Sequence, residues 1–282
     1  MELLQLKYFC SAAETQNFSE TAKKFGVPSS GISQSIKRLE EELGTLLFTR
    51  SANKVSINAQ GKVLYKEVST ALMLLENAKN KLKDEDSFVS GEVRILAQTN
   101  RRIVTRAIER FKEQYNDVNF LINHSLSAKP GDFDIIISDD ETNLHNFSET
   151  LLVSEKFLLA VRKKDIPLTP DLTLEDFRNR NFITMPKGSS HFIHTNRICR
   201  AEGFAPDITI QIDDPYYLRK YVEMGLGIAF VPEISWQGMF STDVSLIDIG
   251  NYTRNTYIFQ NPNRYKTKAV MVFLDTLLNR VK

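Results

Sequence analysis

Residues 17–44, NFSETAKKFGVPSSGISQSIKRLEEELG, constrain the fold most strongly, because they describe two short helices joined by a tight turn. Ser19 is placed to cap the first helix, and Glu20 complements its positive N-terminal end. Gly26 suits the left-handed position that ends this helix, and Pro28 pre-sets entry into the next one. The segment therefore predicts a helix-turn-helix, an arrangement that reads DNA.

The second helix of the pair is amphipathic. Its apolar residues recur at spacings of four, three and four, which places them on one buried stripe. These residues are Ile32, Ile36, Leu39 and Leu43. The opposite, polar side can donate to phosphates or base edges in a major groove. The candidate DNA contacts on it are Ser29, Ser30, Ser33, Gln34, Lys37 and Arg38. An ordinary amphipathic helix pair with a solvated face is the alternative interpretation.

The flanking residues complete a winged domain. Residues 3–15 form a third helix with an apolar side, and residues 47–57 alternate as a two-stranded hairpin around a polar turn. Arg50 and Lys54 lie where such a wing meets phosphate, so both join the candidate DNA contacts. We expect the DNA-binding domain to span residues 1–58.

Three further motifs follow the two helices: LEEELG at residues 39–44, an LF-x-R segment ending at Arg50, and VSINAQG at residues 55–61. With this combination the N-terminal part of the chain resembles the LysR-type transcriptional regulators. Asn58 stands where that family usually has Thr, but Asn is also a good N-cap, so we expect the fold to be kept. Ser29-Ser30-Gly31 replaces a more common Gln-Pro-Ala type segment, which indicates an operator preference of its own.

A long helix is predicted next. From Gln60 to Lys83 there is no Pro and no Gly other than Gly61, and apolar residues alternate spacings of four and three, as in a coiled coil. The members of this seam are Leu64, Val68, Ala71, Leu75, Ala78 and Leu82. In the resembled family the corresponding helix, here residues 59–86, links the domains and dimerises the chain. Packing of the stripe on its own protein is the alternative.

The remaining residues, 87–282, follow an acidic run at 84–86 and alternate strand and helix signals, which predicts an α/β domain. The resemblance is looser here and clearest at VEMGLGIAFVP, residues 222–232. It implies a domain like a periplasmic binding protein, with two α/β lobes joined by crossing strands and a small-molecule effector between them. The implied lobes are residues 90–161 with 265–282, and residues 162–264. The strand signals cover residues 92–96, 118–122, 134–137, 182–184, 208–212, 228–231 and 256–259, and the helix signals cover 104–111, 190–202, 215–224 and 266–281.

Ligands of open α/β sheets bind beyond the carboxyl ends of the strands, where helix N-termini point free N–H groups. The polar residues predicted at such ends, and so the candidate effector contacts, are Gln98, Thr99, Asn100, Ser125, Ser127, Ser138, Thr184 and Asp213. Arg101 and Arg102 follow in the first turn of a helix, where cations oppose the dipole; they either meet an anion or are solvated. The family commonly has a short helix where this chain has only residues 123–132, so we expect one pocket wall to be missing or rearranged.

Two histidines, His191 and His194, share one face of a predicted helix. They either bind a metal with a third ligand or are two polar surface residues, and the second interpretation is favoured. The sequence predicts no metal site and no cofactor.

The two cysteines, Cys10 and Cys199, fall in different predicted domains, so we expect inert thiols and no intramolecular disulfide. A redox switch at Cys199, which Arg197 and Arg200 flank, is the weaker alternative.

Enzyme motifs are missing from the sequence: it has no GxSxG, HExxH, CxxC pair or Walker A segment. With 282 residues, 42% hydrophobic and a net charge of +1, the chain suits a small domain plus a larger one. It has no secretory signal and no apolar run near the roughly 18 residues that span a bilayer. We therefore expect a cytoplasmic protein.

Together these observations predict a ligand-responsive regulator whose effector domain biases the arrangement of paired winged helices on DNA. The fold class is α/β overall, with an all-α winged helix-turn-helix at the N-terminus. Expected partners are double-stranded promoter DNA, a small-molecule effector, further copies of the chain as homodimer or homotetramer, and RNA polymerase. An exposed apolar face on helix 104–111 is the candidate tetramer contact. A regulator that senses no metabolite and an enzyme tethered to DNA are the alternatives.

Overall fold

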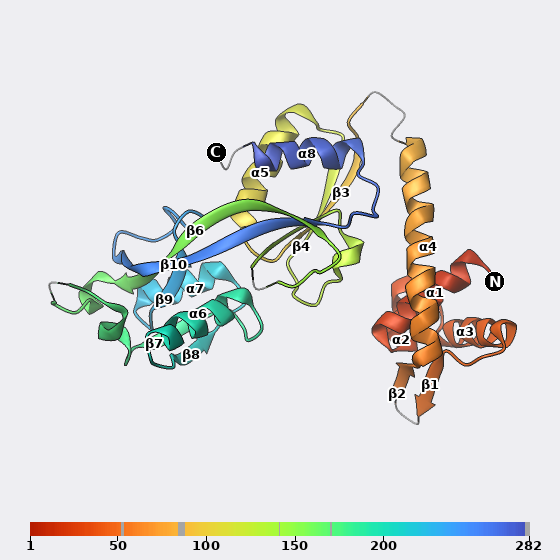
Figure 1. The fold of residues 1–282 in the computed structure, drawn as a ribbon, viewed down its shortest axis with the longest axis horizontal. Coiled ribbons are helices and arrows are strands. Elements are labelled where there is room, and N and C mark those ends of the chain that lie inside the picture. The colour runs from red at the N-terminus through yellow and green to blue at the C-terminus, as the bar shows by residue number, and fades with distance from the viewer. Residues whose placement is uncertain (52–53, 84–87, 141, 170, 280–282) are drawn as a thin grey trace. The chain divides into compact units, whose positions relative to one another are not determined.

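The computed structural model describes all of the chain except residues 52–53, 84–87, 141, 170 and 280–282 (Figure 1). The protein divides into two compact units, Met1–Asp86 and Ser87–Lys282. The acidic run that was predicted to separate two domains lies outside the described residues.

The N-terminal unit contains the predicted helix-turn-helix and hairpin. Its elements are α1 (Leu3–Thr15), α2 (Phe18–Phe25), α3 (Ser29–Leu43), β1 (Phe48–Ser51), β2 (Lys54–Ile57) and α4 (Ala59–Lys83). Gly26 has a φ of +66° and ends α2, as predicted. The predicted cap of α2 was wrong by two residues. Asn17, not Ser19, is the N-cap, and its side-chain oxygen accepts from the backbone N–H of Ser19 at 3.0 Å and of Glu20 at 3.2 Å.

The core of this unit is the predicted stripe of α3 packed against α1 and the hairpin. Ile32, Ile36 and Leu39 are fully buried, whereas Leu43, the last residue of α3, is 39% exposed. The start of α4 is held close to the hairpin at Gly61, where a Cβ would lie 2.2 Å from the Leu47 carbonyl oxygen. A side chain at this position would therefore force the long helix away from the core.

The predicted seam of α4 is split between two roles. Leu64 and Val68 pack into the core of the same unit, because the first turns of α4 contact α1. Val68 is buried within the single chain, so its predicted dimerisation role is corrected to the alternative, an intrachain one, while the role of the partly buried Leu64 stays a prediction. The later members of the seam are exposed within the unit: Ala71, Leu75, Ala78 and Leu82.

The C-terminal unit is an α/β domain. Its helices are α5 (Arg101–Gln114), α6 (Ser190–Ala201), α7 (Pro215–Met224) and α8 (Lys268–Leu278), with 3₁₀ turns η1 (Pro130–Asp132), η2 (Lys163–Asp165) and η3 (Leu174–Phe177). Its strands are β3 (Gly91–Ala97), β4 (Val118–Asn123), β5 (Ile135–Asp139), β6 (Ser148–Arg162), β7 (Asn181–Thr184), β8 (Asp207–Gln211), β9 (Ala229–Pro232) and β10 (Val244–Gln260).

Two long strands join the halves of this domain. β6 and β10 pair antiparallel along their whole length and lie in a six-stranded sheet of order β4-β3-β5-β10-β6-β9. We call β3, β4, β5, α5 and α8 lobe I, and β7, β8, β9, α6 and α7 lobe II; Figure 1 shows β6 and β10 running from one to the other. Because β6 and β10 each run through both lobes, neither strand belongs to one lobe alone. The predicted boundaries, residues 90–161 with 265–282 for one lobe and 162–264 for the other, therefore stay predictions.

One expectation about assembly was wrong. The apolar side chains of α5, Val104, Ala107 and Phe111, are buried in the core of lobe I. An amphipathic helix covers a sheet with its apolar face, so these side chains are not available to a second copy of the chain. None of the described helices is both long and apolar enough to cross a membrane.

Candidate functional site

The N-terminal unit presents the predicted polar face of α3. Ser33 is half-buried, and the other five predicted contacts on this helix are exposed: Ser29, Ser30, Gln34, Lys37 and Arg38. Lys37 makes only an exposed ion pair with Glu41, at 3.5 Å, and such pairs exchange readily for other partners. The polar side of α3 is therefore available to a DNA groove.

The wing is tied to α3 through one buried carboxylate. Glu40 accepts from the backbone N–H of Leu47 at 2.8 Å and of Phe48 at 3.2 Å, and from the Arg50 guanidinium at 2.9 Å. Arg50 also lies 5.4 Å from the centroid of the Phe18 ring. The structure thus gives Arg50, predicted as a phosphate contact, a role in positioning the hairpin. Lys54 pairs with Ser51 through the backbone, and its side chain lies outside the described residues.

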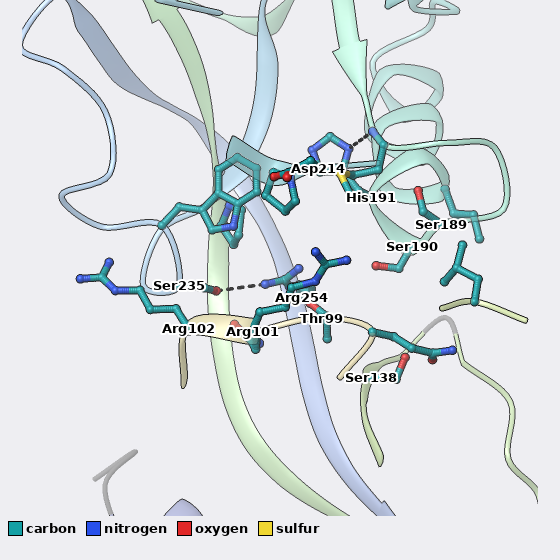
Figure 2. A pocket seen from close by; sticks show the side chains of 18 of the residues that line it. Thr99, Arg101, Arg102, Ser138, Ser189, Ser190, His191, Asp214, Ser235 and Arg254 are labelled. Atoms are coloured by element: carbon teal, nitrogen blue, oxygen red, sulfur yellow. Dashed lines mark hydrogen bonds between the residues drawn. The ribbon is translucent and has the colours of Figure 1, made fainter. Parts of the chain in front are cut away.

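The C-terminal unit contains a cavity of about 420 Å³ between the two lobes (Figure 2). Four of the predicted effector contacts line it from lobe I: Gln98, Thr99, Asn100 and Ser138. Asn100 caps the start of α5 in a left-handed conformation with a φ of 51°, and its amide donates to the Thr256 hydroxyl at 2.6 Å. Arg101 and Arg102 line the cavity as well, so the anion-facing interpretation of their position agrees with the geometry.

The other four predicted contacts are placed elsewhere. Ser125 and Ser127 are exposed and bond to each other at 2.8 Å, while Leu126 between them lines the cavity. Residues 123–132 contain no α-helix, as expected, and Leu126 supplies an apolar wall there.

Thr184 is fully buried in β7 and does not line the cavity. Asp213 is exposed, but the next residue, Asp214, caps α7 by accepting from the Tyr216 N–H at 2.7 Å and does line it. Neighbouring residues of an extended segment point to opposite sides, so a prediction one residue out selects the wrong face.

Most of the lobe II wall of the cavity consists of residues that the sequence did not predict. Its main members are Ser189, Ser190, His191, Tyr216, Arg219, Ser235 and Trp236, with Arg254 from the crossing strand β10. Two of these could have been found, because Ser189 and Ser190 start helix α6, where the free N–H groups point outward. The others come together only through the tertiary fold.

Positive charge dominates the cavity. Among the described lining residues there are four arginines, Arg101, Arg102, Arg219 and Arg254, and one acid, Asp214. Arg219 lies 5.3 Å from the centroid of the Trp236 ring, and burial lowers the pKa of its guanidinium from the ordinary value. A cavity of this charge suits an anionic ligand.

The positive charge of Arg254 is neutralised by the buried carboxylate of Glu155. Its guanidinium lies 2.6 Å from Glu155, which also accepts from the backbone N–H of Ser235 at 2.8 Å and of Ile234 at 3.0 Å. Burial alone would raise the pKa of Glu155, but the charge of Arg254 and the hydrogen bonds from Ser235 hold it below the ordinary value. Glu155 therefore stays ionised at neutral pH.

The two histidines are buried, which corrects the expectation of surface residues. His191 lines the cavity, donates from Nε2 to the Phe230 carbonyl at 2.8 Å and stacks on Trp236 with ring centroids 6.4 Å apart. Burial lowers its pKa to about 4. His191 is therefore neutral near pH 7 and adds no positive charge to the cavity.

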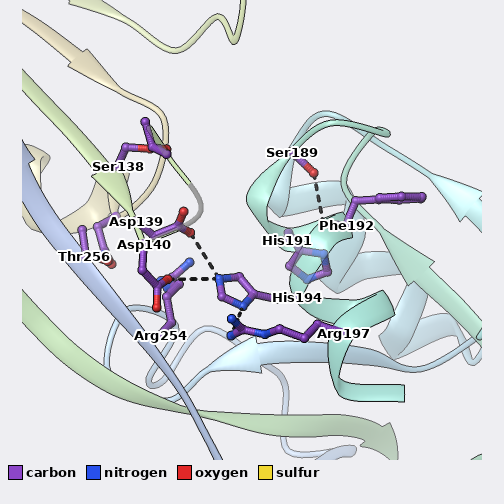
Figure 3. Close-up of polar contacts among 12 residues, drawn as sticks. Ser138, Asp139, Asp140, Ser189, His191, Phe192, His194, Arg197, Arg254 and Thr256 are labelled. Atoms are coloured by element: carbon purple, nitrogen blue, oxygen red, sulfur yellow. Dashed lines mark hydrogen bonds and ion pairs between the residues drawn. The ribbon is translucent and has the colours of Figure 1, made fainter. Parts of the chain in front are cut away.

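His194 joins the two lobes. Its Nε2 lies 3.6 Å from Asp139 and 3.5 Å from Asp140, both at the end of β5, while Arg197 donates to its Nδ1 at 2.8 Å (Figure 3). A guanidinium can only donate, so Nδ1 is the acceptor and Nε2 carries the proton. The cluster is thus an interlobe polar contact, and its His194, Asp139 and Asp140 ligand atoms lie within 4.8 Å of one another. His191 is not part of this group, so the two histidines do not form one ligand set.

Cys199 does not have the environment of a redox switch. It is fully buried, and burial raises the pKa of its thiol to about 12, although Arg197 and Arg200 flank it in sequence. Reactive cysteines need an accessible thiolate. Cys10 and Cys199 form no disulfide, and both thiols are buried.

Comparison with known proteins agrees with both units. Residues 3–62 match the family described as bacterial regulatory helix-turn-helix protein, lysR family, and residues 87–282 match the LysR substrate binding domain. The Transcriptional dual regulator GltC of Bacillus subtilis (strain 168) is 30% identical over 244 residues, 83% of this chain and 81% of GltC. The regulator CysL of the same organism is 22% identical over 284 residues, 96% of this chain and 95% of CysL.

Solved structures share the fold at lower identity. Full-length OxyR C199D from Pseudomonas aeruginosa is 18% identical, with a TM-score of 0.70 over 98% of this chain and 94% of that one. Full-length CbnR complexed with its target DNA is 18% identical, with a TM-score of 0.62 over 100% of both chains. The chain therefore belongs to the LysR family and is a DNA-binding transcriptional regulator with an effector-binding domain, not an enzyme.

Proposed function

We propose that the effector of this regulator is a small organic anion held between the lobes. The observation that supports this most directly is the excess of four arginines over one acid in the cavity wall. Since Glu155 already balances Arg254 and Asp214 partly offsets Arg219, most of the charge of Arg101, Arg102 and Arg219 remains for the ligand. Guanidinium groups bind carboxylates in two parallel hydrogen bonds, so one or more carboxylates are the expected charged groups.

The rest of the effector is expected to be apolar. Met185, Ile193, Trp236 and Met239 line the same cavity, and none of these side chains carries a charge. An organic body packed against them would lose water-exposed surface on binding, which contributes to affinity. A carboxylate with an aliphatic or aromatic body therefore fits the wall better than a bare inorganic anion.

The mechanism we propose is a population shift. The cavity is lined from both lobes, so a ligand that touches both favours the closed arrangement by its difference in affinity for the two states. The interlobe contact of His194 with Asp139 and Asp140 restricts the same motion. Closure of the two lobes would change the spacing or angle at which the paired winged helices bind promoter DNA.

Trp236 offers a direct test, because it is the single tryptophan of the chain and lines the cavity. Its fluorescence is titrated with aliphatic and aromatic mono- and dicarboxylates, each matched with its neutral amide. We expect saturable changes with carboxylates only, weakened about tenfold or more in Arg219→Gln or Arg101→Gln. Equal responses to the amides would contradict an anionic effector.

We also propose a homodimer formed through α4, with dimers pairing into tetramers on dyad-related promoter sites. The exposed seam of Ala71, Leu75, Ala78 and Leu82 supports the dimer, since its spacings of four, three and four suit a coiled coil. Contact with RNA polymerase at the promoter, in the cytoplasm, is proposed from the family resemblance.

A footprint on the DNA upstream of the protein's own gene tests the whole assembly, with and without a small-molecule extract of the source cells. A protected dyad-related site whose extent changes with extract is the expected result. A site that extract leaves unchanged would favour a regulator that works without a ligand.

A further inference from the structure

A second cavity lies on lobe I, on the side of α5 that carries three arginines. Arg102, Arg106 and Arg110 are spaced by four residues, so their side chains lie on one side of the helix. They line a cavity of about 220 Å³, whose other walls include Val153 of β6, Leu277 of α8 and Ile234 after β9. Arg102 alone of the three also lines the interlobe cavity.

The described wall of this cavity carries positive charge only. No acidic side chain is among the described residues that line it. Like charges four residues apart on a helix repel each other. In the described part of the chain Arg106 and Arg110 nevertheless make no ion pair and no hydrogen bond through their guanidinium groups. Only Arg102 has such a partner, the Gln237 carbonyl.

The floor of the cavity is apolar. Val153 and Leu277 are almost completely buried, so they form a fixed floor with little accessible area, and Ile234, 49% exposed, adds accessible apolar surface at the edge. A ligand that filled the cavity would place an apolar body on this floor and an anionic group beside the arginines. An inorganic anion would use only the arginines.

We propose that this cavity is a second binding site, separate from the interlobe one, for a small carboxylate with an apolar body. Two guanidinium groups, those of Arg106 and Arg110, bind the carboxylate, and the apolar floor takes the chain or ring. The site does not depend on the proposed interlobe effector, because neither arginine reaches the interlobe cavity.

Hexanoate and its neutral amide, hexanamide, are the probes for a test by calorimetric titration of the full-length protein. The wild-type protein is compared with Arg106→Gln/Arg110→Gln, which removes the site, and with Arg219→Gln, which alters only the interlobe cavity. Lys112→Gln, a cation of the same helix outside the cavity, is the matched control. Arg106 and Arg110 are not buried, so an unchanged thermal midpoint is expected and verifies folding.

The proposal expects saturable hexanoate binding that the double variant weakens about tenfold or more, while Arg219→Gln and Lys112→Gln retain it. Trp236 fluorescence separates the two cavities, because this binding is expected to persist when the tryptophan signal is lost in Arg219→Gln. Equal binding of hexanamide, equal binding by the double variant, or no saturable binding through the millimolar range would overturn the proposal.

Discussion

The guanidinium of Arg254 lies 2.6 Å from the carboxylate of Glu155, and both side chains are almost completely excluded from water. The pair connects the crossing strands β6 and β10, and it faces the interlobe cavity. Breaking a buried ion pair on one side leaves an uncompensated charge, whereas replacing both partners by apolar groups is often tolerated.

Glu155→Gln is therefore expected to lower the free energy of unfolding by about 3 to 5 kcal/mol. The double variant Glu155→Gln/Arg254→Met removes the uncompensated charge and keeps an amide oxygen to accept from the Ser235 N–H, so it should recover much of this loss. Lys156→Gln, which breaks the neighbouring surface pair with Asp248, should cost about 1 kcal/mol or less. Urea unfolding at neutral pH measures all three. A Glu155→Gln protein as stable as wild type would show that the pair is not buried in solution.

The stability of the effector domain is expected to fall between pH 6.5 and pH 5 because of His191. Burial lowers its folded pKa to about 4, so in this window the unfolded chain binds a proton that the folded chain does not. Stability therefore rises with pH here, and the change attributable to His191 is about 1.5 kcal/mol. The buried carboxylates Asp139 and Glu155 have lowered pKa values, so their stabilisation is lost only at lower pH.

Thermal midpoints measured at several pH values check this expectation. His191→Gln should flatten the pH dependence between pH 6.5 and pH 5, and His145→Gln, at an exposed position, serves as the control. The same pH dependence in wild type and His191→Gln would contradict a neutral, buried His191.

The elements that were predicted correctly are those whose own residues mark them, through a residue that ends a helix or a short buried apolar run. Gly26 and Gly44 mark helix ends, β5 is a short run that is buried throughout, and β3 ends in the buried apolar residues 95–97. β6 was missed because its pairing with β10 shifts register between Thr256 and Tyr257 and again between Asp248 and Thr253. Each shift interrupts the alternation of apolar and polar residues on which a strand prediction depends.

The candidate site was predicted on one side only. Gln98, Thr99 and Asn100 follow β3 directly, and Ser138 lies near the carboxyl end of β5, so sequence order is enough to place them. The lobe II wall comes from the start of α6, from α7 and from the loop after β9. These segments face lobe I only because β6 and β10 run from one lobe to the other. No local pattern specifies that closure.

Readout of base sequence is expected to depend on Gln34, which is exposed on α3. Gln34→Ala should reduce discrimination between the preferred site and its single-base variants by about 1 to 3 kcal/mol. Lys37→Ala should weaken all sequences about equally and reduce the salt dependence of binding. Binding titrations on a set of mutated sites separate these effects. An equal loss on every sequence from Gln34→Ala would remove its proposed readout role.

Arg50 is expected to act through the fold of the wing. Arg50→Ala removes the partner of buried Glu40, so it should lower the thermal midpoint of the DNA-binding domain as well as its affinity for DNA. Lys37→Ala, at an exposed position, should change affinity alone. Measuring both properties on both variants makes the distinction. Wild-type thermal stability in Arg50→Ala, with weaker DNA binding, would return Arg50 to a direct phosphate contact.

Dimerisation is expected to depend on the exposed half of the α4 seam and not on its buried half. Leu75 is 55% exposed within the unit, whereas Val68 is 6% exposed in the helix-turn-helix core. A charge at Leu75 would be buried only in a dimer, so Leu75→Glu should dissociate the dimer and leave the helix-turn-helix folded. Val68→Glu places a charge in the core of a single chain and should unfold that domain. Sedimentation velocity with circular dichroism measures both outcomes. A Leu75→Glu protein that remains dimeric at micromolar concentration would locate the dimer interface outside this seam.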